Sequence, residues 1–328
     1  MVDVASEQWR RRCLKPNPDR WGTWTARRFG RPVALRLTRV AEALGITADQ
    51  ATAAAATAML AAVAAFAYGT PSAWLVGSLL LVVWYLLDHV DGQLARLNGT
   101  ASLDGTTVDY LMHHSWNLLV PSAVGFGLAR RFDEPLWCAA GLAWSWGALM
   151  ITLRHDARYK AFFQRLKLLR GEVRTVGGGG GRPEAASWPR RGVGLWSKWF
   201  ALKAYEQHVV TAALLILSVV RVSIGPIGDA VTAAYVALLA LPAPLIALRL
   251  ILVAHGRGEA EREFAAWFRV PEGATLELRD GWWIVEGCTA TDATGNIVAG
   301  EIASCPDCRH PNEGDAIDVV LTRLVDRP

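Results

Sequence analysis

Long apolar runs dominate the chain between residues 48 and 254, and short polar stretches separate them. Six of these runs come close to the roughly 20 residues that an α-helix needs to cross the hydrocarbon core of a membrane. They are residues 48–68, 72–96, 104–129, 135–157, 207–224 and 229–254. Because a backbone in lipid must satisfy its own hydrogen bonds, the pattern predicts an all-α integral membrane bundle of six transmembrane helices over residues 47–255.

The two ends of the chain and one internal connection differ from these runs. Within residues 1–46, the segment 23–44 mixes apolar residues with arginines, as does a helix lying on a membrane surface. A basic flank that only fixes the membrane topology explains it equally well. Residues 158–205 predict a long connection with a glycine-rich linker at 177–181. Residues 256–328 predict a small β-rich domain, because alternating segments flank the turn signal Asp280-Gly281.

Composition and charge support a membrane protein and indicate its orientation. Of the 328 residues, 52% are hydrophobic and 20% charged, which is more apolar than an ordinary soluble protein. Basic residues precede the first run and fill the connection between the fourth and fifth. The positive-inside rule therefore predicts a multi-pass protein of the cytoplasmic (inner) membrane with both termini in the cytoplasm. The net charge of +4 would attract the protein to anionic lipid. We expect no nucleic-acid partner.

Five cysteines are scattered along the chain, and two of them form a C-x-x-C pair. Cys305 and Cys308, with His310 close by, have the spacing of zinc ligands. A turn that carries two free thiols is the alternative interpretation.

A polar motif interrupts the second and third apolar runs. At helical pitch, Asp88 and Asp91 share one face, and Gly105, Asp109 and His113 share another. Carboxylates are costly inside a membrane, so they usually mark a functional site, although ion pairs inside a bundle are the alternative. If the two faces oppose each other, three carboxylates and an imidazole meet in one pocket. Oxygen-rich clusters of this kind bind hard divalent cations.

The spacing of this motif resembles the signature of the CDP-alcohol phosphotransferase family, D-x2-D-G-x2-A-R-x8-G-x3-D-x3-D. Seven of its eight positions match, and His113 stands where the family has its last aspartate. The matching residues are Asp88, Asp91, Gly92, Ala95, Arg96, Gly105 and Asp109. The resemblance covers roughly residues 30–255, and it implies a membrane enzyme of phospholipid biosynthesis that is a homodimer.

The resemblance also implies roles for individual residues. Asp88, Asp91 and Asp109 would bind Mg²⁺ or Mn²⁺, two ions in all, or one because His113 removes a negative charge. The residues that would line the site of the CDP moiety are Gly92, Ala95, Arg96, Gly105 and, near the start of the first run, Thr52. For Gly92, Ala95 and Gly105, close packing between helices is a second explanation.

His113 and two arginines are open to more than one interpretation. Histidine near neutral pH accepts a proton and also binds metals, so we interpret His113 as the general base, as a metal ligand, or as a sign of lost activity. Arg154 and Arg158, at the end of the fourth run, would bind a phosphorylated acceptor such as a polyol phosphate. Anchoring of that run by positive charge is the alternative.

The function expected from the resemblance is transfer of a phosphatidyl group from CDP-diacylglycerol to a small hydroxyl acceptor, with release of CMP. Within the family, the alternative is transfer of a phospho-head group from a soluble CDP-alcohol to a lipid alcohol. Two other classes fit a membrane bundle with buried acids. They are a transporter, and a non-catalytic membrane protein that binds a nucleotide.

Overall fold

The computed structural model describes residues 4–14, 25–168, 172–177, 202–257, 275–279, 282–286 and 315–320. It forms two compact units, Met1–Thr152 with Trp196–Arg249, and Leu153–Leu195 with Leu250–Pro328. Residues 178–181 of the predicted linker and the zinc candidates Cys305 and Cys308 lie outside the described residues.

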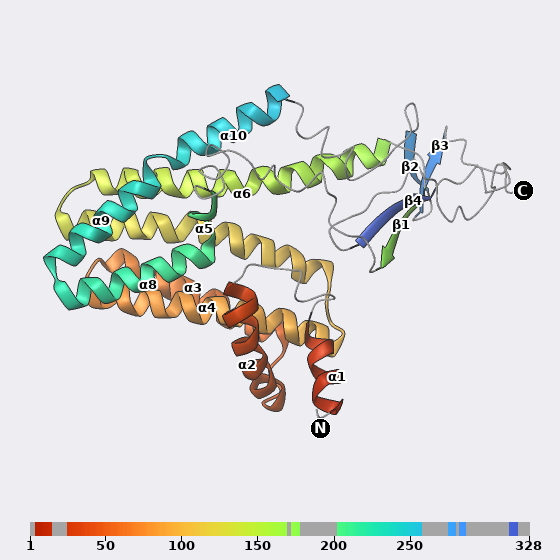
Figure 1. Cartoon of the computed structure of the whole chain (residues 1–328), viewed down its shortest axis with the longest axis horizontal. Coiled ribbons are helices and arrows are strands. Elements are labelled where there is room, and N and C mark those ends of the chain that lie inside the picture. Colours follow the sequence, from red (N-terminus) through yellow and green to blue (C-terminus); the bar gives the residue numbers. More distant parts are fainter. Residues whose placement is uncertain are drawn as a thin grey trace, which may run out of the picture. The chain divides into compact units, whose positions relative to one another are not determined.

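The first unit is a bundle of helices. Its elements are α1 (Val4–Cys13), the π-helical segment η1 (Ala26–Gly30), α2 (Arg31–Ala43), α3 (Ala48–Tyr68), α4 (Pro71–Asn98), α5 (Leu103–Phe132), α6 (Leu136–Leu168), α8 (Gln207–Ile224), α9 (Pro226–Ala240) and α10 (Ala243–Arg257). Helices α6 and α10 continue into the second unit. Within the bundle, α4 packs against α3 on one side and α8 on another, while α1 and α2 contact α4 (Figure 1).

Local residue chemistry explains where α3, α4 and α5 begin and end. The side chains of Thr47, Thr70 and Ser102 each accept a hydrogen bond from a backbone N–H in the first turn of these helices. At the other end, α3 and α4 stop at Gly69 and Gly99, both of which have positive φ. The connections between the three helices are therefore short, and the helices alternate in direction. This arrangement brings the end of α4 beside the start of α5.

Glycines let several helices of the bundle approach each other at backbone distance. A Cβ atom added to Gly125 would lie 2.5 Å from the Cα of Gly141, and one on Gly127 would lie 2.0 Å from the carbonyl oxygen of Phe66. Such contacts between small residues are the usual way in which transmembrane helices pack closely. They join α5 to α6 and α3, so α5 is fixed on two sides.

Five segments of the described residues are long and apolar enough to cross a membrane. They are Ala48–Tyr68, Pro71–Asn98, Leu136–Arg158, Gln207–Ile224 and Pro226–Leu252. The run predicted at 104–129 is helical as α5, but it is not among the five, because His113, His114 and Asn117 lower its hydropathy. The run predicted at 229–254 is two helices, α9 and α10, with a turn at 241–242. The segments indicate a multi-pass membrane protein, and six crossings stay a prediction.

The end of the bundle where α3, α5 and α8 finish contains a buried ion pair. Arg221 donates from Nε to Asp229 Oδ1 at 2.7 Å, and both side chains are at least 95% buried. Arg131 reaches the second carboxylate oxygen of Asp229 at 2.8 Å, and the guanidinium of Arg221 lies 4.2 Å from the ring centre of Trp74. These contacts tie α4, α5, α8 and α9 together.

The second unit contains four short strands. Strand β1 (Glu172–Gly177) pairs antiparallel with β4 (Asp315–Val320), and β2 (Thr275–Arg279) pairs antiparallel with β3 (Trp282–Glu286). Strand β1 lies inside the connection 158–205, for which the sequence predicts no strand, so that prediction is incomplete. A β-rich domain spanning residues 256–328 stays a prediction, since most of those residues are not described.

Candidate active site

The structure brings Asp88 of α4 together with Asp109 and His113 of α5. One ligand atom from each of these three side chains lies within 4.8 Å of the other two. Nε2 of His113 is 3.7 Å from Asp88 Oδ1 and 3.4 Å from Asp109 Oδ1. Asp109 and His113 are one helical turn apart on α5, and the short connection after Asn98 places their face opposite α4.

Asp91, the fourth predicted metal ligand, lies outside this group of three. The hydroxyl of Thr52 on α3 is 2.8 Å from Asp91 Oδ2, and the N–H of Gly92 donates to Asp91 Oδ1. The carboxylate is therefore held one turn from Asp88, on the side of α4 that faces α3. Thr52 thus contacts the acidic motif directly, and its role toward a nucleotide stays a prediction.

The donor set fits a hard divalent cation. Asp88 is 16% exposed and Asp109 49% exposed, so the group is sheltered on α4 but open on α5. Carboxylate oxygens are the preferred ligands of Mg²⁺, and an imidazole nitrogen beside them is also acceptable to Mn²⁺. Two imidazoles lie beside Asp88, with His89 Nδ1 3.6 Å from Oδ2 and His113 Nε2 3.7 Å from Oδ1.

Arg96, a candidate for the nucleotide site, is held by a contact with helix α1. Its Nε donates to the carbonyl oxygen of Cys13 at 2.8 Å. Its Nη1 lies so close to Gly92 that a Cβ added there would be 3.2 Å away. Ala95 is half-buried on the same helix, and Gly105 is exposed in the first turn of α5, where its N–H donates to Ser102 Oγ.

Helix α1 is part of the surroundings of Arg96, which the sequence does not predict. Arg12 donates to the carbonyl oxygen of Leu97 at 2.6 Å. Trp9 Nε1 donates to Glu42 Oε2 at 2.7 Å, and the guanidinium of Arg39 lies 5.5 Å from the Trp9 ring centre. Helix α1 is thereby fastened to both α4 and α2. Because one partner of Arg96 is a backbone carbonyl, no residue type in the sequence signals this contact.

Cys13, the last residue of α1, is buried, and its thiol is therefore a reporter of this docking. Burial raises the pKa of Cys13 to about 11, with a smaller contribution from Glu42. At pH 8 the thiol is then almost wholly protonated, whereas a free cysteine with a pKa of about 8.5 is partly thiolate. Trp9→Ala removes the contacts that fasten α1 to α2 and is expected to speed alkylation of Cys13 by N-ethylmaleimide at least about tenfold. Mass spectrometry of the modified chain measures the rate.

Cys138 supplies the internal control for this experiment. It is half-buried on α6, far along the chain from α1, so its alkylation rate should be the same in both proteins. An unchanged rate at Cys13 in the Trp9→Ala variant would show that Trp9 does not hold α1 in place.

Gln207, the first residue of α8, contacts the ring of His113. Its Oε1 is 2.6 Å from His113 Nδ1, and its Nε2 donates to the carbonyl oxygen of His113 at 2.7 Å and to Asn117 Oδ1 at 3.2 Å. Sequence reasoning missed Gln207, because a single amide at the start of an apolar run has no fixed spacing to the motif.

Two further features bear on the predicted site. Arg154 and Arg158 belong to the part of α6 that falls in the second unit, so their role toward an acceptor stays a prediction.

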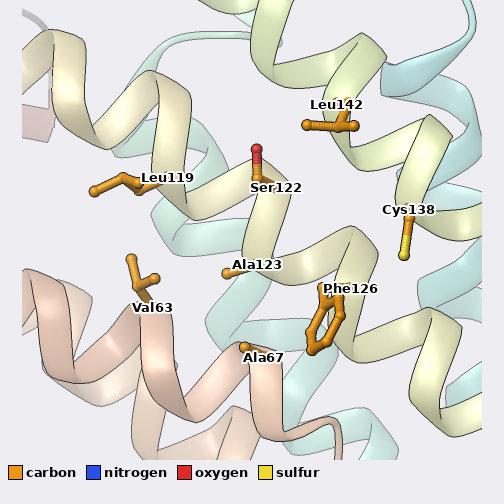
Figure 2. Close-up of a pocket in the computed structure, with 8 residues that line it drawn as sticks. All are labelled: Val63, Ala67, Leu119, Ser122, Ala123, Phe126, Cys138 and Leu142. Atoms are coloured by element: carbon orange, nitrogen blue, oxygen red, sulfur yellow. The ribbon is translucent and has the colours of Figure 1, made fainter.

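A groove of about 330 Å³ lies between α3, α5 and α6, and Figure 2 shows its lining of mainly aliphatic and aromatic side chains. It contains one hydroxyl, that of Ser122, and no charged group, so it does not suit a nucleotide.

Comparison with known families gives one match. The family model described as CDP-alcohol phosphatidyltransferase matches residues 46–169. This segment contains α3, α4, α5 and α6, and with them Asp88, Asp109 and His113. No curated protein shows significant similarity to the chain.

Proposed function

We propose that this chain, in which residues 46–169 form a CDP-alcohol phosphatidyltransferase domain, transfers a phosphatidyl group from CDP-diacylglycerol to a small hydroxyl acceptor. CMP is the second product. The family indicates phosphatidyl transfer in phospholipid synthesis, and its members typically depend on divalent metal ions. We expect the active site and both termini to face the cytoplasm and the protein to be a homodimer.

The observation that carries the proposal is the convergence of Asp88, Asp109 and His113 at one end of a bundle of apolar helices. A diphosphate at this end would meet carboxylates that repel it unless cations lie between them. Asp88, Asp109 and Asp91 supply the oxygen ligands for such cations, and the imidazole of His113 stands beside them. A transporter needs polar groups along a conduit, whereas these groups cluster on facing turns of α4 and α5.

The reaction joins the acceptor oxygen to the phosphorus that carries the diacylglycerol. The bond from this phosphorus to the bridging oxygen breaks, and its electron pair leaves with CMP. His113 Nε2 takes the proton of the acceptor hydroxyl as the new bond forms. A divalent cation on Asp88, Asp91 and Asp109, when bound, would neutralise the diphosphate and stabilise the leaving group. Arg96 would pair with phosphate oxygens through the Nη atoms that its bond to Cys13 leaves over.

The purified full chain tests this function. It is given CDP-diacylglycerol labelled in the glycerol backbone, Mg²⁺ or Mn²⁺, and a series of polyols and polyol phosphates. The expected result is release of CMP together with a new labelled lipid. Label that stays in CDP-diacylglycerol, combined with CMP release from a soluble CDP-alcohol and diacylglycerol, would instead support the head-group transfer within the same family. Binding of CDP without turnover of either donor would contradict both.

A further inference from the structure

The amide of Gln207 has only one orientation that satisfies its neighbours. Asn117 donates its Nδ2 to Thr152 Oγ1 at 3.0 Å, which turns its Oδ1 toward Gln207. The carbonyl oxygen of His113 is a second acceptor at the same side of the Gln207 amide. The NH₂ group of Gln207 must face these two oxygens. Its Oε1 is then the atom 2.6 Å from His113 Nδ1.

This orientation determines which ring nitrogen of His113 carries the proton. Oε1 has no hydrogen to donate, so a bond at 2.6 Å requires a hydrogen on Nδ1. Whenever the ring is neutral, this is its single N–H, and the lone pair is then on Nε2. Nε2 is the nitrogen that faces Asp88 and Asp109. We propose that Gln207 is a positioning residue that accepts a hydrogen bond from His113 Nδ1 and turns Nε2 toward Asp88 and Asp109, so that whenever the ring is neutral its lone pair is on Nε2.

The opposite form would be unfavourable in this structure. With the hydrogen on Nε2, the lone pair of Nδ1 would oppose the lone pairs of Gln207 Oε1 at hydrogen-bond distance. The ring cannot avoid this by rotating freely, because it packs edge-on against Trp84, with ring centres 5.8 Å apart. Partners of this kind commonly fix the tautomer of a functional histidine. An aspartate, which the family has at this position, has no tautomer of this kind, so the need for Gln207 arises with His113.

The importance of this contact for turnover rests on the proposed function, and a double-mutant cycle measures it. Gln207→Met has a similar size but neither accepts from Nδ1 nor donates to His113. It is expected to lower kcat by about 10- to 100-fold, as for other partners of functional histidines. KM for CDP-diacylglycerol should change little. In a His113→Asp background, the same substitution should have less than about a threefold effect, because the carboxylate has no ring tautomer to set.

Equal losses in the two backgrounds would mean that Gln207 only joins α8 to α5, and this would overturn the proposal. So would an unchanged kcat in Gln207→Met. The His113→Asp variant is therefore the matched control, since it keeps the contacts of Gln207 with the backbone carbonyl and Asn117.

A measurement on the resting protein separates this proposal from the proposed function. Nitrogen NMR of the full chain labelled in histidine nitrogens identifies the His113 signals by their loss in His113→Gln. In the neutral ring the expected proton is on Nδ1, and Gln207→Met should shift the neutral population toward Nε2–H. A proton on Nε2 of the neutral ring in the wild-type protein would refute the proposal even if the enzyme is active. If every CDP-linked donor fails while Nδ1–H is observed, the proposed function falls and the positioning by Gln207 stands.

Discussion

Replacing Asp88 with asparagine is expected to lower CMP release from CDP-diacylglycerol by about a thousandfold, which corresponds to roughly 4 kcal/mol of transition-state stabilisation. Asp88 is the residue of α4 that contributes to the group of three ligand atoms, and it is the most sheltered of the three side chains. The amide keeps the shape of the side chain but removes the charge that would hold a cation. Stabilisation by a metal ion contributes several kcal/mol to such reactions. Initial rates at saturating Mg²⁺ and Mn²⁺ measure the effect.

Asp133→Asn is the matched control for this substitution. Asp133 caps the opposite end of α5 at a positive φ of 54°, a conformation that asparagine also tolerates. The same charge is removed, but far from Asp109 along the helix, so the rate should stay within about twofold of wild type. A rate above a tenth of wild type in Asp88→Asn would exclude Asp88 as an essential metal ligand.

Asp229→Ala is expected to destabilise the bundle more than any other single change described. The Arg221 side chain is fully buried, and its only carboxylate partner among the described residues is Asp229. Removing one member of a buried ion pair costs about 3–5 kcal/mol, because the other charge is left without compensation. For a bundle of this size, we expect the melting temperature in detergent to fall by about 10 °C.

Two further variants test the cause of this loss. Arg131 is 41% exposed, so Arg131→Ala leaves the pair of Arg221 and Asp229 intact and should lower the melting temperature much less. Combining Asp229→Ala with Arg221→Leu should recover part of the loss, since no buried cation remains. A double variant that melts at a lower temperature than Asp229→Ala alone would contradict the explanation.

Helix positions could be predicted where an apolar run has clear ends. The predicted bounds 48–68 and 207–224 are those of α3 and α8. Thr47 caps the start of α3, and glycines follow the ends of both runs. The prediction was less accurate for 229–254. Its apolar residues are continuous, but Leu241 and Pro242 form a turn that periodicity does not reveal. Strand β1 was missed for a different reason, since its partner β4 lies far away in the sequence.

The candidate site divides in the same way into local and distant parts. Asp88, Asp109 and His113 lie within one helical hairpin, so helical spacing was enough to group them. Gln207 lies 94 residues after His113, and the carbonyl oxygen of Cys13 lies 83 residues before Arg96. These contacts depend on how helices pack together, and a single sequence contains no pattern that predicts them. The acids of the site could be predicted, and the groups that orient its imidazole and guanidinium could not.

The distance between His113 and Gln207 in the chain has a consequence for biosynthesis. A ribosome makes α4 and α5 long before α8, so the growing polypeptide already carries its three carboxylates and its histidine while Gln207 is still untranslated. During this interval the His113 ring has no contact with the Gln207 amide. Under the proposed function, the nascent hairpin therefore holds its cation ligands before its base is oriented, and we expect catalytic competence only after the fifth apolar segment has inserted beside the second.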